Sequence, residues 1–120
     1  MAKEITIQAA LNWANGGASV AGSFVAQLDQ TGNDGMQETQ DVLTSATAIT
    51  MGNITGAPKA LLVKNLDKTN YVEIDSANTF DKFPQKVLPG AVILLAPQTA
   101  TIYGRANTAT VKIMKIAAEA

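Results

Sequence analysis

Carboxylates come nearest to a catalytic pattern in this chain of 120 residues, which contains neither histidine nor cysteine. Paired carboxylates can act as general acid and base, and Asp67, Glu73, Asp75 and Asp81 lie close together in the sequence. The alternation of side chains puts Glu73 on the outward face of a strand, Asp67 in a turn and Asp75 at a strand end. Nothing in the pattern brings two of them into one pocket, so we expect all four on the solvated surface.

The acidic loop Asp29–Gly35 comes nearest to a metal site. Its spacing fails the EF-hand pattern, because Thr31, Asp34 and Gln40 occupy the third, sixth and twelfth positions counted from Asp29. Without histidine and cysteine, the chain also lacks the commonest general base, the commonest transition-metal ligand and a thiol nucleophile. We therefore expect a protein that is not an enzyme and has no catalytic, metal-binding or cofactor-binding residues.

Charge and hydropathy exclude two classes of partner. The net charge is −1, from nine basic and ten acidic residues without a basic run, which argues against nucleic acid as a partner. The glycines of residues 15–22 precede a strand instead of a helix, so they indicate a turn and not a phosphate cradle. No segment approaches the ~20 apolar residues of a membrane span, and the N-terminus alternates instead of resembling a signal peptide. We expect synthesis in a cytoplasm and no membrane partner.

The composition suits a surface that neighbouring proteins cover. Apolar residues make up 47% of the chain and charged residues only 16%. Thr, Asn, Gln and Ser dominate the remainder, whereas a free monomer normally keeps itself soluble through charge. The length corresponds to one domain, residues 1–120.

Side chains alternate between apolar and polar over most of the chain, as in half-buried strands. Residues 4–13 and 20–28 each place apolar side chains on one face, with a turn at 15–17 between them. We predict that the loop at 31–35 closes the second run onto residues 36–42, for which a short helix at 36–46 is the alternative. We place the lone Trp13 in the core, and eight further residues are predicted to point inward: Ile5, Ile7, Leu11, Phe24, Leu28, Val72, Ile74 and Val111.

The middle of the chain contains two strongly marked turns. Residues 60–66 and 70–74 are predicted strands, which the segment 65–70 closes into a hairpin, with Asp67 and Asn70 bonded to nearby backbone N–H groups. Pro89-Gly90 fits the centre of a type II turn. The strand at 91–96 is apolar on both faces, so we expect it to be central or covered by a partner. Our candidate subunit or capsid interface consists of Val92, Leu94 and Leu95.

The spacing of these elements predicts the fold class. About eight to ten short strands follow one another at intervals of roughly 8–12 residues, which is typical of a sandwich or barrel. We expect an all-β protein, an antiparallel β-sandwich of the jelly-roll type.

Residues 60–120 carry motifs that resemble those of small virion proteins of tailed bacteriophages. The segments that carry the resemblance are Asn65-Leu66-Asp67, Thr69-Asn70-Tyr71-Val72, Leu88-Pro89-Gly90, and Tyr103 with Ala106 and Ala109. One departure is Ala91, where an acidic residue is frequent. The resemblance implies a structural component of the particle and identifies no active site.

Within that class, the resemblance implies a capsid decoration or cement protein on the capsid surface of the virion. Such a protein is expected to be a homo-oligomer, namely a trimer. It is expected to bind the major capsid protein and to stabilise the mature head. Two alternatives stay open. One is a tail, neck or fibre-associated protein of the same particle, and the other is a small domain that binds carbohydrate or the host surface.

Overall fold

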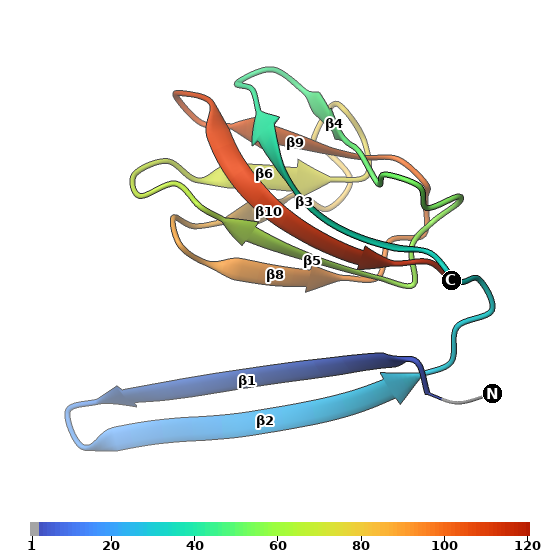
Figure 1. Cartoon of the computed structure of the whole chain (residues 1–120). Coiled ribbons are helices and arrows are strands. Elements are labelled where there is room, and N and C mark those ends of the chain that lie inside the picture. Colours follow the sequence, from blue (N-terminus) through green and yellow to red (C-terminus); the bar gives the residue numbers. More distant parts are fainter. Residues whose placement is uncertain (1–2) are drawn as a thin grey trace. The chain divides into compact units, whose positions relative to one another are not determined.

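The computed structural model describes residues 3–120, and the strands in this part of the chain are all antiparallel (Figure 1). No helix occurs among these residues, so the helix considered at 36–46 is wrong. The ten strands are β1 (Ile5–Asn15), β2 (Ala18–Leu28), β3 (Gly35–Val42), β4 (Thr47–Ile49), β5 (Ala60–Asn65), β6 (Val72–Asp75), β7 (Gln85–Val87), β8 (Val92–Leu95), β9 (Ile102–Ala106) and β10 (Val111–Ala118).

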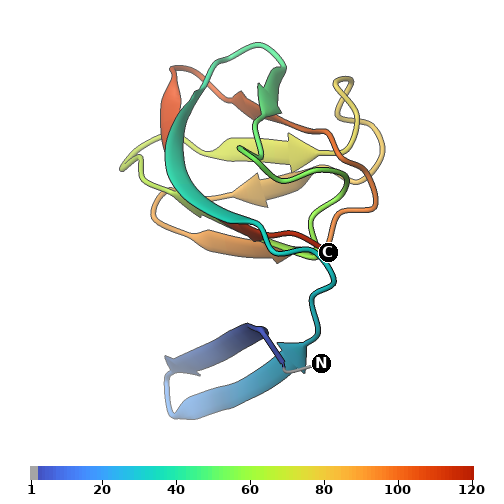
Figure 2. The same cartoon turned by 45° about the vertical axis from the view of Figure 1, so that its right-hand side comes forward.

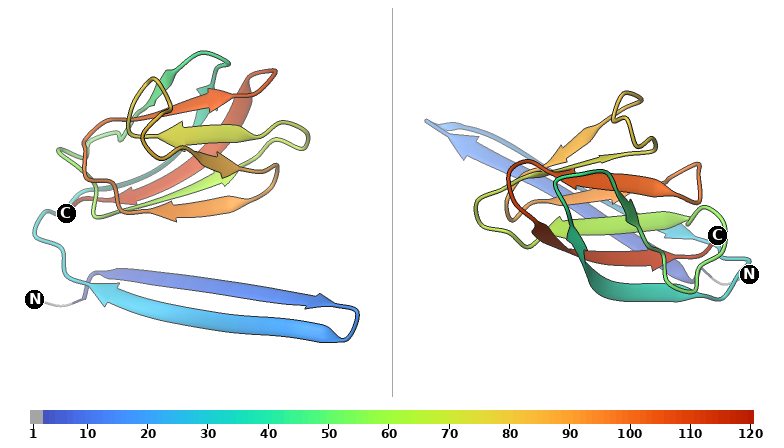
Figure 3. Two further views of the ribbon diagram at one scale, coloured as in Figure 1. Left: turned by 180° about the vertical axis from the view of Figure 1, so that it is seen from behind. Right: turned by 90° about the horizontal axis from the view of Figure 1, so that it is seen from above.

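The chain divides into two compact units, Met1–Thr31 and Gly32–Ala120. The first unit contains β1 and β2, which pair with each other over their whole length, from Ile5 opposite Leu28 to Asn15 opposite Ala18 (Figure 3). We call these two strands and their turn the arm. The second unit contains the other strands, and we call it the body.

The turn of the arm follows from its two glycines. Gly16 and Gly17 have φ of 60° and 88°, the conformation that a two-residue hairpin turn of type I′ requires. Residues with a Cβ adopt this conformation only with strain, which explains the Asn-Gly-Gly segment at this point. The turn predicted at 15–17 is therefore confirmed.

The body is sandwich-like, with two four-stranded sheets of order β3-β10-β5-β8 and β4-β9-β6-β7 (Figures 1 and 2). Both sheets contribute to one core. The first supplies Val42, Leu61, Val63, Val111, Ile113 and Ala117, and the second supplies Ile49, Val72, Ile74, Val87, Ile102 and Ala106, with Met51 and Ile54 from the connection after β4.

Two predicted strand pairings are wrong. β2 pairs with β1 and not with residues 36–42, which form β3 and pair with β10. β5 and β6 belong to different sheets, so the segment between them is a crossing from one sheet to the other and not a hairpin loop. Turn-forming residues fix the local path of the chain, but they do not determine which strand the next segment pairs with.

The predicted local chemistry of that crossing is confirmed in part. The Asp67 carboxylate accepts hydrogen bonds from the backbone N–H groups of Thr69, at 2.9 Å, and Asn70, at 2.6 Å. Asn65, which is fully buried, adds bonds that the sequence did not suggest: its amide donates to the carbonyls of Asn70 and Val87 and accepts from the Asp67 N–H. The crossing is thus fixed from both of its ends.

The predictions for buried residues divide between the two units. Val72, Ile74 and Val111 lie in the core of the body, as predicted. In the arm, Ile5 is buried and Ile7 and Leu28 are half-buried, but Leu11 is 73% and Phe24 80% exposed, so their predicted core positions are wrong. Trp13 is also exposed, which corrects its placement in the core.

Candidate functional site

The arm separates its side chains into two different faces. Residues directly opposite each other in a pair of strands point to the same side of the sheet, and neighbours in sequence point to opposite sides. One side therefore carries apolar residues and a glycine at every pair except the last, Asn15 opposite Ala18, and we call it the apolar face of the arm. Its members are Ile5, Ile7, Ala9, Leu11, Trp13, Val20, Gly22, Phe24, Ala26 and Leu28.

Most of the apolar face is exposed, and it carries no charge. No Asp, Glu, Lys or Arg occurs between Glu4 and Asp29. A two-stranded hairpin is at best marginally stable in water, and a long apolar strand with free edges is prone to pair with other chains. Large exposed apolar patches mark interaction sites in soluble proteins. The arm is therefore the part of this chain best suited to bind another protein.

A second exposed apolar surface lies on the body, on the outer side of the sheet that contains β8. Leu62 lies opposite Leu94 on one neighbouring strand and opposite Ile116 on the other, so the three side chains form a row across β8, β5 and β10. Their exposed fractions are 41% for Leu94, 37% for Leu62 and 41% for Ile116. We call these three residues the outer row.

The predicted interface residues Val92, Leu94 and Leu95 all belong to β8, which is an edge strand and not a central one. Val92 and Leu94 share the outer side of the sheet and are exposed. Leu95 points the other way and packs against the core. The structure thus places Leu94 in the outer row and Val92 beside it, and it places Leu95 among the residues that hold the body together.

The four carboxylates of the central region do not form a site. Glu73 pairs with Arg105 at 3.2 Å, and Asp81 accepts a hydrogen bond from the Thr79 hydroxyl at 2.6 Å. Asp67 bonds its own turn, and these backbone N–H groups hold the pKa of its carboxyl below the ordinary value. Each of these carboxylates therefore serves its own local structure.

Asp75 is the exception to the predicted solvated surface, because it is buried. Its carboxylate accepts hydrogen bonds from the N–H groups of Ser76, Lys82 and Phe83, at 2.7, 2.9 and 3.1 Å. Burial raises the pKa of Asp75, but these three bonds outweigh it and hold the pKa below its ordinary value. Asp75 thus anchors the loop between β6 and β7.

A pocket of about 370 Å³ opens beside Asp75. Its lining combines apolar side chains, such as Phe83 and Leu95, with uncharged polar ones, such as Gln85 and Gln98. Because backbone N–H groups already occupy both oxygens of Asp75, its carboxylate is an anchor of the pocket wall and not a free acid.

The carboxylates of the acidic loop at 29–35 have separate partners. Asp29 forms an ion pair with Lys3 at 3.3 Å, and Asp34 accepts a hydrogen bond from the Asn53 amide at 2.9 Å. Across residues 3–120, no three side chains of His, Cys, Asp or Glu converge in a way that would hold a metal ion. Within the same range, no helix is long and apolar enough to cross a membrane.

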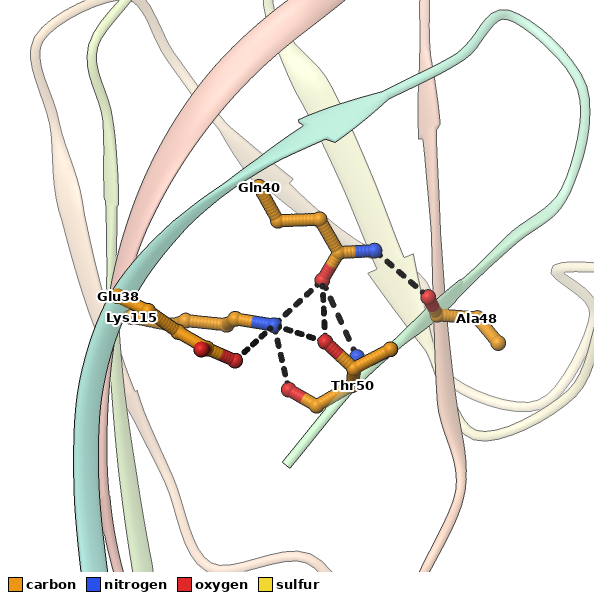
Figure 4. Close-up of polar contacts among 5 residues, drawn as sticks. All are labelled: Glu38, Gln40, Ala48, Thr50 and Lys115. Atoms are coloured by element: carbon orange, nitrogen blue, oxygen red, sulfur yellow. Dashed lines mark hydrogen bonds and ion pairs between the residues drawn. The ribbon is translucent and has the colours of Figure 1, made fainter. Parts of the chain in front are cut away.

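A buried lysine is the main polar feature that sequence reasoning missed. The Lys115 side chain is fully buried, and its ammonium group donates to the Gln40 side chain at 2.6 Å and to the hydroxyl and carbonyl of Thr50 (Figure 4). Glu38 forms an ion pair with it at 3.3 Å. Burial lowers the pKa of Lys115, and the Glu38 carboxylate counteracts part of that effect. The phase of β10 was the available signal, because Val111, Ile113 and Lys115 all point inward.

These contacts make Lys115 a structural link and not a reactive amine. Its ammonium group is surrounded by acceptors from β3 and from the residue after β4, so it joins β10 to two other segments (Figure 4).

Comparisons with family models, with curated proteins and with solved structures found no match for this chain.

Proposed function

We propose that this protein is a structural component of a tailed-phage virion, a decoration protein that binds the major capsid protein and stabilises the mature head. The observation that carries the proposal is the arm, in which one whole face is apolar, uncharged and largely exposed. Such a face gains free energy by leaving water against another protein. The body then acts as a rigid block, and the arm joins it to a neighbouring protein of the particle.

The pairing of the body strands supports a finer fold assignment, the jelly roll. The first body strand pairs with the last (β3 with β10), the second with the second last (β4 with β9), the third with β8, and β6 with β7. This is the pattern of an eight-stranded antiparallel ribbon folded into two sheets. Jelly rolls are common in viral capsid proteins and lectins, which agrees with a virion role.

Two of the motifs that resemble phage virion proteins lie at turns of this body, and the motif of Tyr103 and Ala106 lies in β9. Asn65, Asp67 and Asn70 fix the crossing between β5 and β6. Gly90 has a φ of 77°, and the Ala91 N–H donates to the Leu88 carbonyl at 2.9 Å, which closes the predicted turn. The resemblance therefore rests on residues that fix the fold, and it supports the same class of particle component.

Self-association is part of this proposal. A homotrimer would present several copies of the body to a lattice whose sites repeat, and linked weak contacts gain strength through effective concentration. A protein that binds only the mature lattice stabilises that lattice in proportion to occupancy and affinity.

The test compares particles with and without the protein. We expect shells that lack it to form but to burst at a lower temperature or under a milder osmotic shock. Particles rebuilt with the variant Phe24→Asp, altered on the apolar face, should burst as easily as shells that lack the protein. Particles rebuilt with Val25→Asp, altered on the other face, should regain resistance to heat and osmotic shock.

The copy number per particle separates the alternatives. A number comparable with that of the major capsid protein supports a place on the shell, whereas a number typical of tail proteins favours a tail, neck or fibre-associated role. Equal resistance of both kinds of particle would contradict the decoration function.

A further inference from the structure

We propose that the apolar face of the arm of one copy docks on the outer row of a second copy, so that each copy gives one arm and receives one. This inference builds on the self-association in the proposed function and names the surfaces that mediate it. Its test needs only the purified chain, so a failure here leaves capsid binding standing.

The two surfaces match in chemistry. On the arm, Leu11, Trp13 and Phe24 are exposed by 73%, 49% and 80%, with no charged residue from Ile5 to Leu28. Burying an uncompensated charge is costly, so an uncharged apolar face selects a partner surface without charges. The outer row is such a surface, and β8, which contributes Leu94 to it, adds only the apolar Val92 on the same side.

The charged residues around the outer row lie mainly on one side of it. Lys64 lies opposite Val92, and Lys112 pairs with Asp41 at 3.0 Å, so the charges of this side of the sheet lie toward one end of β5 and β10. At the other end, Leu62 and Ile116 lie opposite each other. An apolar ribbon on the row therefore lies away from Lys112 and Asp41, and the long side chain of Lys64, two residues from Leu62, can keep its ammonium group in water.

The size of the arm favours an assembly in which each copy gives one arm and receives another over an assembly with a single arm contact. With eleven residues in each strand, the arm is about 37 Å long and about 10 Å wide, so one face has a footprint of about 370 Å². A stable interface buries about 800 Å² on each partner. Giving one arm and receiving one provides each copy with two such contacts, whereas contact between two arms alone provides only one.

The chain supplies its own probe of this contact. Trp13 is its only tryptophan, and it belongs to the apolar face of the arm. Docking removes water from the indole ring, so the emission of Trp13 should shift to shorter wavelength and resist quenching by acrylamide. We expect both changes to appear as the protein concentration rises, in parallel with the mass measured by sedimentation.

Charge substitutions with matched controls locate the two surfaces. Phe24→Asp on the arm and Leu62→Asp on the outer row should each raise the concentration at the assembly midpoint at least about tenfold. Val25→Asp, 64% exposed on the other face of the arm, and Leu88→Asp, 55% exposed outside the row, should change it less than about twofold. A control that weakens assembly as much as its partner variant would overturn the assignment of that surface.

Disulfide trapping covers the case in which a charged variant does not fold, because the natural chain contains no cysteine. Leu11→Cys and Ile116→Cys variants, mixed under oxidising conditions, should give a cross-linked pair of the two different chains, whereas Val25→Cys should give none with Ile116→Cys. Cross-links only between two Leu11→Cys chains would show contact between arms and overturn the proposal. A monomer with Trp13 shielded or exposed equally at all concentrations would overturn it as well.

Discussion

In the arm, Leu11 and Phe24 follow the same alternation of apolar side chains as Val63 and Val111 in the body, yet the first pair is exposed and the second is fully buried. The difference lies in what covers the sheet. In the body, each four-stranded sheet contributes side chains to one shared core. In the arm, most of both faces of the two-stranded sheet is exposed. Alternation thus predicts an apolar face that favours burial, but it does not show which segment or protein packs against that face.

Charge distinguishes the two regions further. The arm has no charged residue from Ile5 to Leu28, whereas the body has ion pairs between Arg105 and Glu73 and around the buried Lys115. A region that folds on its own remains soluble through surface charge, and a region meant for an interface loses it. We therefore expect the stability of the folded chain to depend on the body and its proposed association to depend on the arm, and the following experiments test that division.

Removing core volume should produce the largest effect, and only in the body. Ile74→Ala should lower the free energy of unfolding by about 2–4 kcal/mol, because it loses buried surface and leaves a cavity. Leu11→Ala, also in the middle of an apolar strand face, should lower it by less than about 0.5 kcal/mol. Urea denaturation in dilute solution measures both. A similar loss in the two variants would show that the arm is part of the cooperative unit.

Removing the Asp75 anchor should come next. Asp75→Asn replaces one of the two acceptor oxygens by an NH2 donor, which leaves at least one backbone N–H of the loop after β6 without an acceptor, and it should lower the stability of the body at pH 7 by about 1–3 kcal/mol.

The pH dependence of this difference is a second readout. The folded-state pKa of Asp75 lies below the ordinary 3.8, so the stabilisation by its carboxylate is fully present above that pH. It is lost as the pH falls through the folded-state pKa. The difference in stability between wild type and variant should therefore shrink as the pH falls below 3.8. A constant difference would assign the effect to packing instead of charge.

Backbone strain tests the arm by itself. Gly17 has a φ of 88°, so Gly17→Ala should destabilise the arm by about 1 kcal/mol and speed hydrogen exchange of the β1 and β2 amides. Gly22→Ala is the matched control, because a Cβ at that position meets no atom within 4 Å and the φ is ordinary. It should leave exchange unchanged or slower. The amides of the body should respond to neither variant.

Surface ion pairs should show the smallest effects, and here the two regions should behave alike. The pairs Lys3–Asp29 beside the arm and Lys112–Asp41 on the body are both about half exposed. Asp29→Asn and Asp41→Asn should each change stability by less than about 0.5 kcal/mol, and high salt should abolish the difference. A larger effect of Asp29→Asn would indicate that the base of the arm depends on that pair.

Much of the local structure was predictable from the residues. Strands, the turn at 15–17, the turn at Pro89-Gly90 and the bonds of Asp67 all follow from alternation and from the chemistry of Gly, Pro, Asn and Asp. These are short-range effects, in which a residue determines the conformation of its own neighbours. The apolar composition of β8 is likewise visible in the sequence, and its use as an interface stays a prediction.

Pairing and burial were decided by tertiary structure. The partners of β3 and β5 come from the distant β10, and the burial of Asp75 and Lys115 depends on acceptors and donors from other segments. The pattern of residues in a strand shows which of its faces is apolar. It does not specify which segment pairs with the strand in the sheet or packs against it in the core. For this reason the sequence by itself determined an all-β chain with two-faced strands. Only the tertiary structure decided that the apolar faces of the two body sheets share one core, while most of the apolar face of the arm is exposed.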